Sequence, residues 1–502
     1  MSCSPQRRNL ARGGECVSPA APAPCRRRPA APSSLGRLRR SPAALCATLA
    51  LGGGLALGAA IPAAAPQFHF PPGAETISIP LVRGVNQQLL GHIAPIVEEA
   101  IAAGVFPGAV ILAVHRGHVI YRGAFGSRML RPERPMRFDT IFDMASVTKV
   151  VATTPSVMQL YQEGRFRLDA RVTRYWPPFG NDGKEKVTIR ELLTHFSGLP
   201  PDIPTPRLLE ILHLPPTHFP GWPPEENVDV PWHGLQPALR LVSQAHLISP
   251  PGKRFIYSDI NFIVLGYLVQ KLSGQPLNVY AEQHVFAPLG MTSTRFLPPK
   301  SWRYRIAPTQ FLDGHLRWGQ VQDPTATAMG GVSGLAGLFS DARDLGRYAQ
   351  CLLNGGVLPV RQPDGSTKRV RILGPLTVLK MTTPQTPLGN PDIRSLGWDL
   401  DSSFSRNRGT LFPMGSFGHT GWTGTDIWID PATQSYVIVL ASRFDGPTVL
   451  PGGPVMNVRM KVANIVAASL DDVNIWHNVP EMSNTGRGER FRAFPHYPRN
   501  QQ

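Results

Sequence analysis

The sequence predicts an α+β fold: one antiparallel sheet flanked by helices, with a mostly helical insertion lobe. Two apolar-rich runs near the start, residues 109–115 and 119–125, flank a short polar turn and predict a β-hairpin. Two further strand-like runs, residues 425–430 and 436–442, flank a second turn near the other end. Helical patterns and proline-rich segments fill the middle of the chain. Strands at both ends therefore favour a single sheet built from both ends of the chain.

Helices are predicted from apolar spacing and from the residues that start and break helices. An amphipathic pattern covers residues 85–103, and a helix should start at Ser146 and be broken or restarted at Pro155. The proline-crowded stretch 199–252 holds one helical piece, near residues 236–247. A last helix is predicted from helical spacing of apolar residues: Val455, Val458, Val462, Ile465 and Val466.

Composition divides the chain into three parts. Residues 1–65 hold nine arginines and one acid, Glu15, and so carry +8 of the total net charge of +17. Their basic head, Ala/Leu/Gly-rich middle and small-residue end are typical of an export signal, and Arg39-Arg40 suits twin-arginine export. The alternative is an uncleaved membrane anchor at residues 43–65. We expect an exported protein, periplasmic or secreted, with a main domain at 66–470 and a polar tail at 471–502.

Charge and cysteine content exclude some classes of protein. The positive charge outside residues 1–65 is not clustered, so no nucleic-acid partner is expected, and a membrane contact is expected only through the N-terminal segment. Four of the five cysteines lie in residues 1–65. The fifth, Cys351, lies in a helical run at 342–353. We expect residues 1–65 to be removed, which leaves Cys351 no partner for an intramolecular disulfide. Stability must therefore come from an apolar core.

The most informative motif is Ser146-Val147-Thr148-Lys149, the only Ser-x-x-Lys in the chain. Residues three apart share one face of a helix, so the Lys149 amine can reach the Ser146 hydroxyl. A serine hydroxyl becomes a strong nucleophile when a neighbouring base takes its proton, and a buried lysine with a lowered pKa can be that base. Alone, the spacing is far more typical of a solvated helix face than of a catalytic pair.

Two further motifs follow in order, Tyr257-Ser258-Asp259 and His419-Thr420-Gly421. Taken alone, Tyr257 is more typical of a core aromatic at a helix start. His419 taken alone fits an ordinary strand histidine and a site residue equally well. Glu191 and His195 sit four apart on a predicted helix and could bind a metal, but no third ligand is spaced to join them. We therefore interpret that segment as structural and expect no metal and no cofactor.

Taken together, the three motifs resemble those of the serine β-lactamase and penicillin-binding protein superfamily. Within it they are most similar to the class C-like branch of β-lactamases, D-Ala-D-Ala carboxypeptidases and related esterases. The resemblance extends from Val85 to Leu470. Other stretches that carry it are residues 142–149, 191–199, 330–339 and 418–424. It implies a β-lactamase/transpeptidase-like fold with a cleft between two lobes.

The resemblance also implies roles for individual residues. Ser146 is the expected nucleophile, Lys149 helps to deprotonate it, and Tyr257, with a pKa lowered by nearby cations, relays protons to the leaving group. The backbone N–H groups of Ser146 and Trp422 are expected to form the oxyanion hole. The expected substrate-binding residues are Asp259, His419, Thr420 and Gly421. Which of Lys149 and Tyr257 is the base stays open.

Three departures from the family pattern bear on the substrate. Asp259 stands where β-lactamases have Asn, and an ionised Asp cannot donate to a substrate amide, although it could hold Lys149. His419 stands where they have Lys, and a neutral histidine attracts a carboxylate less well. Leu335 stands where related sequences often have His.

These departures favour small esters or amides and peptidoglycan-derived peptides over β-lactams as substrates. The predicted function is a serine hydrolase that works through an acyl-enzyme. The alternatives are a true class C-like β-lactamase and a non-catalytic penicillin-binding-like protein. The absence of Gly-x-Ser-x-Gly and His-Glu-x-x-His motifs argues against an α/β-hydrolase and a zinc peptidase.

Overall fold

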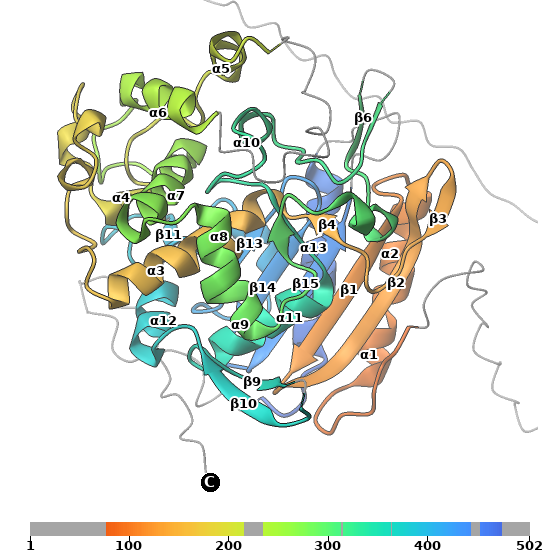
Figure 1. Ribbon diagram of the computed structural model, residues 1–502. Helices are drawn as coiled ribbons and strands as arrows, with labels where there is room; N and C mark the ends of the chain where they lie inside the picture. The colour runs from red at the N-terminus through yellow and green to blue at the C-terminus, as the bar shows by residue number, and fades with distance from the viewer. Residues whose placement is uncertain (1–76, 215–233, 313–314, 363, 443–451, 474–502) are drawn as a thin grey trace, which may run out of the picture. The chain divides into compact units, whose positions relative to one another are not determined.

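The computed structural model describes residues 77–214, 234–312, 315–362, 364–442 and 452–473, all of which belong to one unit, Phe68–Gln502. Its centre is an eight-stranded antiparallel sheet that both ends of this unit build together (Figure 1). The predicted α+β architecture is therefore confirmed. From edge to edge the strands are β11 (Ile393–Arg394), β12 (Asp399–Asp401), β13 (Phe417–Thr420), β14 (Asp426–Asp430), β15 (Ser435–Ala441), β1 (Gly108–His115), β2 (His118–Leu130) and β3 (Glu133–Pro135).

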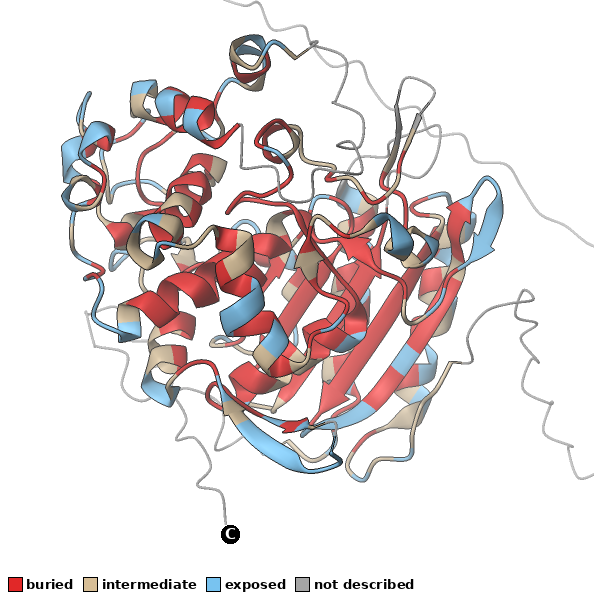
Figure 2. Cartoon of the chain, viewed as in Figure 1, coloured by how far each residue is buried: buried red, intermediate tan, exposed pale blue. Residues whose placement is uncertain are grey.

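Strand β1 shows how the sheet separates two apolar cores. It pairs with β15 from Ala109 opposite Ala441 to His115 opposite Ser435, and it also pairs with β2. Alternate side chains of a strand point to opposite faces. Val110, Leu112 and Val114 accordingly lie in the core under the helical lobe, whereas Ile111 and its alternate neighbours lie in the core on the other face. Strands β1, β14 and β15 are buried throughout, and β3 at the edge is exposed (Figure 2).

The second face of the sheet is covered by helices from the two ends of the unit. These are α1 (Gln87–Gly91), α2 (Ile93–Ala102) and α13 (Gly452–Ala468). The single helix predicted over 85–103 is thus two helices, which meet at His92. Pro95 lies in the first turn of α2, where its missing N–H needs no partner, and this favours a new helix start there. The predicted last helix is confirmed as α13.

The insertion lobe and the first face of the sheet hold the remaining helices. They are α3 (Thr154–Gln162), α4 (Ile189–Thr194), α5 (Thr205–Ile211), α6 (Leu235–Gln244), α7 (Asp259–Ser273), α8 (Leu277–Ala281), α9 (Ala287–Leu289), α10 (Pro324–Ala328), α11 (Ala342–Leu353) and α12 (Pro375–Thr382). The proline-rich stretch therefore holds α5 as well as the predicted helix α6. Cys351 is buried in α11 as a free thiol.

Small sheets complete the described fold. Their strands are β4 (Phe142–Asp143) with β8 (Leu338–Ser340) and β5 (Arg295–Phe296), β9 (Val357–Arg361) with β10 (Thr367–Arg371), and β6 (Gln310–Leu312) with β7 (His315–Arg317). In the β9–β10 pair, β10 is mostly exposed whereas β9 is mostly buried (Figure 2). The three-stranded sheet matters most for function because β4 ends just before Ser146.

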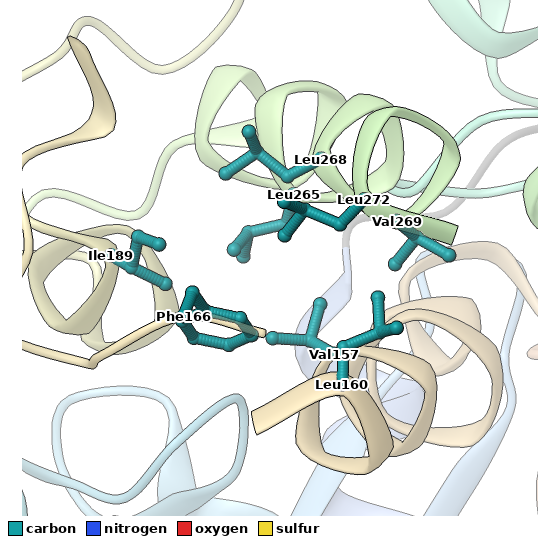
Figure 3. A pocket seen from close by; sticks show the side chains of 8 residues that line it. All are labelled: Val157, Leu160, Phe166, Ile189, Leu265, Leu268, Val269 and Leu272. Atoms are coloured by element: carbon teal, nitrogen blue, oxygen red, sulfur yellow. The ribbon is translucent and has the colours of Figure 1, made fainter. Parts of the chain in front are cut away.

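A small apolar cavity lies in the helical lobe between α3, α4 and α7 (Figure 3). Its walls are apolar side chains: Val157, Leu160, Phe166, Ile189, Leu265, Leu268, Val269 and Leu272. Such a lining gives a water molecule or a polar substrate no hydrogen-bond partner. This cavity is therefore a gap in core packing and not a candidate site.

Three sequence-based expectations fall on residues outside the described part of the chain. They are the export signal at 1–65, the alternative anchor at 43–65, and the tail beyond residue 473. Within the described residues, none of the helices combines the length and the apolar character that crossing a membrane requires.

Candidate active site

Ser146 is presented by a strained turn directly after β4. Ala145 has a φ of 45°, which is uncommon for a residue other than glycine, and such backbone strain concentrates at functional sites. The Asp143 carboxylate holds this turn because it accepts hydrogen bonds from the backbone N–H of Ala145 at 2.8 Å and of Gln322 at 2.6 Å. Ser146 itself is partly exposed to solvent.

The helix predicted to start at Ser146 is built from three kinds of turn. A 3₁₀ turn covers Ala145–Val147, a π-helical turn covers Lys149–Thr153, and α3 follows. Pro155 lies in the first turn of α3, as expected for a residue that cannot donate a backbone hydrogen bond. π-Helical turns are rare and occur frequently at functional sites.

Lys149 is buried, and polar groups surround its amine. Its Nζ lies 2.9 Å from Ser146 Oγ, 2.8 Å from the Leu335 carbonyl oxygen and 2.6 Å from Asp259 Oδ1. Burial lowers the pKa of Lys149, but the charges and hydrogen bonds of Asp259 and Tyr257 raise it more, so its pKa lies above the ordinary value. The lowered pKa considered for a lysine base is therefore wrong, because Asp259 compensates the buried charge.

Tyr257 lies between two aromatic rings, with its hydroxyl hydrogen-bonded to Ser146 and Lys149. His195 stacks on it with ring centroids 4.4 Å apart, and Phe404 stacks on it at 5.1 Å. Burial raises the pKa of Tyr257, the Lys149 charge lowers it and the Asp259 charge raises it, with a net rise. The predicted lowering of this pKa is wrong, because burial and the Asp259 carboxylate outweigh the cation.

Asp259 is the first residue of α7, and the expectation that it could hold Lys149 is confirmed. Its carboxylate forms the 2.6 Å ion pair with Lys149, and its backbone N–H donates to the Pro201 carbonyl at 2.6 Å. Two more carboxyl groups interact electrostatically with Asp259. Burial raises the pKa of Asp202 to about 6 and that of Asp323 to about 7, and the negative charge of Asp259 adds to both shifts.

Glu191 and His195 have structural roles, as the sequence analysis favoured. Glu191 completes a capping box with Thr188 at the start of α4. His195 ends that helix in the left-handed conformation, and its Nδ1 accepts a hydrogen bond from the backbone N–H of Ser258 at 3.0 Å. The histidine therefore fixes the segment that carries Tyr257. The Thr188-x-x-Glu191 spacing could have predicted the capping box from the sequence. No sequence pattern predicts that His195 stacks on Tyr257.

His419 lies on β13 beside the Tyr257 ring, with 6.0 Å between the ring centroids. Its Nδ1 lies 2.9 Å from the Thr420 carbonyl oxygen, which can only accept, so the proton of the neutral ring is on Nδ1. Burial, together with the charges of Arg394 and Lys149, holds the pKa of His419 well below 6.5. The expectation of a neutral histidine where β-lactamases have a lysine is thus supported.

The turn after β13 is tied to the strand that precedes Ser146. Thr423 Oγ1 donates to the Asp143 carbonyl at 2.7 Å, and Thr425 Oγ1 donates to the Met144 carbonyl at 3.0 Å. A Cβ on Gly421 would lie only 2.5 Å from the Met144 carbonyl oxygen, so glycine is required for this close approach. The backbones of Ser146 and Trp422 are thereby held near each other. Their role as an oxyanion hole remains a prediction.

Arg459, for which no sequence motif predicted a role, stabilises this turn. The buried side chain reaches from α13, and its Nη2 donates to the carbonyls of Gly421 at 3.0 Å and Thr425 at 2.9 Å. A guanidinium can bond two carbonyls at once because its donors form a rigid fork. An arginine within an apolar helical pattern gives no sequence signal for such a distant contact.

We expect Arg459→Met to reduce kcat on a p-nitrophenyl ester by roughly 10- to 100-fold with little change in KM, because small displacements of oxyanion-hole donors act on the transition state. Steady-state kinetics on protein whose fold is verified by circular dichroism would test this. Arg459→Lys, which keeps the positive charge and can still donate hydrogen bonds, should lose less. An unchanged kcat in a folded Met variant would contradict the proposed support.

The comparisons with known proteins agree with this geometry. The family model described as Beta-lactamase matches residues 93–454. A protein of Bacillus subtilis (strain 168) named "N-acetylmuramyl-L-alanine amidase" is 31% identical over 386 residues, which is 71% of this chain and 81% of the relative. The chain therefore belongs to the beta-lactamase family.

Solved structures show the same fold at lower identity. One is described as "EstCE1, a hydrolase with promiscuous acyltransferase activity", with a TM-score of 0.57, 22% identity and coverage of 75% of this chain and 99% of that one. Another is an octameric penicillin-binding protein homologue from Pyrococcus abyssi, with a TM-score of 0.55, 22% identity and coverage of 76% and 79%. Family membership and the Ser–Lys–Tyr cluster define a serine hydrolase that acts on ester or amide substrates.

Proposed function

We propose that Ser146 is the nucleophile of this hydrolase and that Tyr257 exchanges protons with it. The observation that carries the proposal is the meeting of three groups: Lys149 Nζ lies 2.9 Å from Ser146 Oγ, and the Tyr257 hydroxyl is hydrogen-bonded to both residues. A nucleophile with a base and a fixed cation within hydrogen-bond reach is the arrangement that acyl transfer needs.

The reaction proceeds in two steps, formation of the acyl-enzyme and its hydrolysis. With Tyr257 already deprotonated by solvent, Ser146 Oγ forms a bond to the substrate carbonyl carbon while the serine proton passes to the phenolate oxygen of Tyr257. The negative charge that develops on the carbonyl oxygen is stabilised by the backbone N–H groups of Ser146 and Trp422. Tyr257 then gives the proton to the leaving alcohol or amine as its bond to carbon breaks. A water molecule hydrolyses the acyl-enzyme by the same proton path in reverse.

For substrates, we infer small esters and amides, including peptides derived from peptidoglycan. The name of the Bacillus subtilis relative supports a cell-wall substrate. The neutral His419 offers no cation to a β-lactam carboxylate, and the Asp259 carboxylate, held by Lys149, offers no donor to a side-chain amide. An ester requires neither contact.

We propose that the protein acts outside the cytoplasm, in the periplasm or as a secreted enzyme. The support is the basic head, the apolar middle and the small-residue end of residues 1–65. Protease protection of the full chain in spheroplasts, before and after osmotic shock, would test this. Recovery in the cytoplasmic fraction alone would contradict it.

We expect p-nitrophenyl acetate to be hydrolysed with a higher kcat/KM than nitrocefin. An ester needs only the nucleophile, its base and the oxyanion hole. In the double variant Asp259→Asn with His419→Lys, the ratio should move toward nitrocefin by about 1–3 kcal/mol of transition-state binding, because both missing contacts would be supplied. His246→Lys, which adds a lysine at an exposed position on the loop after α6, is the control. A wild type that prefers nitrocefin would make a β-lactamase the better conclusion.

A further inference from the structure

The partners of Lys149 determine where its hydrogens point. The Leu335 carbonyl oxygen can only accept a hydrogen bond, and so can the ionised Asp259 carboxylate. Ser146 Oγ is the third partner, at 2.9 Å. The Tyr257 hydroxyl is a fourth neighbour of the amine. A charged lysine has N–H donors and no lone pair, so as long as Asp259 keeps Lys149 charged, the amine can donate to its neighbours but cannot accept a proton.

The Ser146 proton must then leave in another direction. Its hydroxyl oxygen accepts from Lys149, so its own O–H is free to donate to the remaining neighbour, the Tyr257 oxygen. The Tyr257 ring is held for this contact between His195 and Phe404. The lysine thus acts as a fixed cation, and the tyrosine is the group that can receive a proton.

We propose that Asp259 is a positioning residue that keeps Lys149 as an ammonium ion, so that Ser146 passes its proton to Tyr257 and full activity requires alkaline solution. The inference rests on the proposed function of Ser146 and Tyr257. In the reactive form Tyr257 has lost its proton to solvent. Attack forms the Oγ–carbon bond, moves the serine proton to the phenolate oxygen, and later returns it to the leaving group.

Other titratable and charged groups face this cluster from the elements around it, and all of them contribute to the pH dependence of the activity. The carboxyls of Asp202 and Asp323 interact with both Lys149 and Asp259. The imidazoles of His195 and His419 are held neutral by burial, with Arg394 nearby. Among these groups Asp259 is the one in contact with the amine, so its negative charge has the largest effect on Lys149 and Tyr257.

The direction of the pH dependence follows from the two groups whose pKa values Asp259 raises. Asp259 raises the pKa of both Lys149 and Tyr257, so the reactive phenolate is scarce at neutral pH and becomes more abundant as the pH rises. Replacing Asp259 with Asn removes a negative charge and lowers both pKa values. The acid side of the pH–rate profile should then move to lower pH.

The test is the rate at which a fluorophosphonate probe labels the full-length protein between about pH 6 and pH 11, a range that spans the ordinary tyrosine pKa. The wild-type rate should rise across this range and be lost in Ser146→Ala. In Asp259→Asn the midpoint of the rise should lie lower by about one pH unit or more. Asp259→Glu, which keeps the charge, should retain the wild-type midpoint.

Asp202→Asn is the matched control, because the Asp202 carboxylate accepts from the Thr325 hydroxyl and from the backbone N–H of Ile203 instead of from Lys149. Its midpoint should move much less than that of Asp259→Asn. An unmoved midpoint in Asp259→Asn, an equal shift in Asp202→Asn, or a wild-type rate that does not rise with pH would overturn the inference. If Asp259→Asn does not fold, a lowered midpoint in Asp259→Glu overturns it. A wild type without Ser146-dependent labelling would instead refute the proposed function.

Discussion

Ser146→Ala is expected to abolish ester hydrolysis, with kcat falling by roughly 10⁴-fold or more, because no other group can form the acyl-enzyme. The fold should survive. Ser146 is partly exposed on a 3₁₀ turn, and the turn is held by Asp143 and not by the serine hydroxyl. Losing the hydroxyl leaves one donor of Lys149 without its partner, which should lower the free energy of unfolding by about 1–3 kcal/mol.

The measurements are hydrolysis rate, thermal unfolding and intact mass after incubation with a fluorophosphonate. Wild type should gain the mass of one adduct, and Ser146→Ala should gain none. Ser366→Ala, on the exposed turn between β9 and β10, is the matched control and should behave as wild type. A covalent adduct on the Ser146→Ala protein would show that the nucleophile lies elsewhere.

Much of the fold could be predicted because it depends on local patterns. Apolar-rich, strand-like runs marked β1, β2, β14 and β15, and turn residues marked their hairpins. The interruptions within helices were harder to predict from the sequence. A break at His92 depends on Pro95 and on packing against α13, and the π-helical turn at Lys149 depends on tertiary contacts that propensity does not contain.

The identities of the site residues could also be predicted, but their ionisation could not. Ser146, Lys149 and Tyr257 meet as their motifs indicated. The sign of the tyrosine pKa shift was wrong because sequence shows a nearby lysine without showing how deeply it is buried. It also does not show that Asp259 stands 2.6 Å from its amine. Phe404 stacks on Tyr257, and Arg459 holds the turn after β13. Neither residue belongs to a motif, so the sequence did not predict these contacts.

The two partners of Ser146 should respond differently to mutation. Lys149→Ala removes the cation but leaves the Asp259 carboxylate without its ion pair, so we expect both a loss of acylation by orders of magnitude and a loss of stability of about 3–5 kcal/mol. Thermal or urea unfolding measured beside kinetics would show the combined effect. An unaltered unfolding free energy would mean that the ion pair does not contribute as the structure indicates.

Tyr257→Phe separates chemistry from stability more cleanly. The ring stays stacked between His195 and Phe404, so the fold should lose little, while the group that receives and returns the serine proton is gone. We expect kcat/KM to fall by roughly 10²- to 10⁴-fold, the usual contribution of a general acid–base group. Since that loss comes from proton transfer and not from binding, kcat should fall with KM nearly unchanged.

The control for this change is Tyr267→Phe, which removes a hydroxyl from a tyrosine that packs on Trp176 along α7. It should keep wild-type kinetics. The remaining activity of Tyr257→Phe should also lose the rise with pH that the phenolate gives the wild type, because phenylalanine has no proton to release. Near-wild-type kcat/KM in both Tyr257→Phe and Lys149→Ala would mean that another group takes the serine proton. The ion pair of Lys149 with Asp259 would then describe a resting arrangement from which the reaction departs.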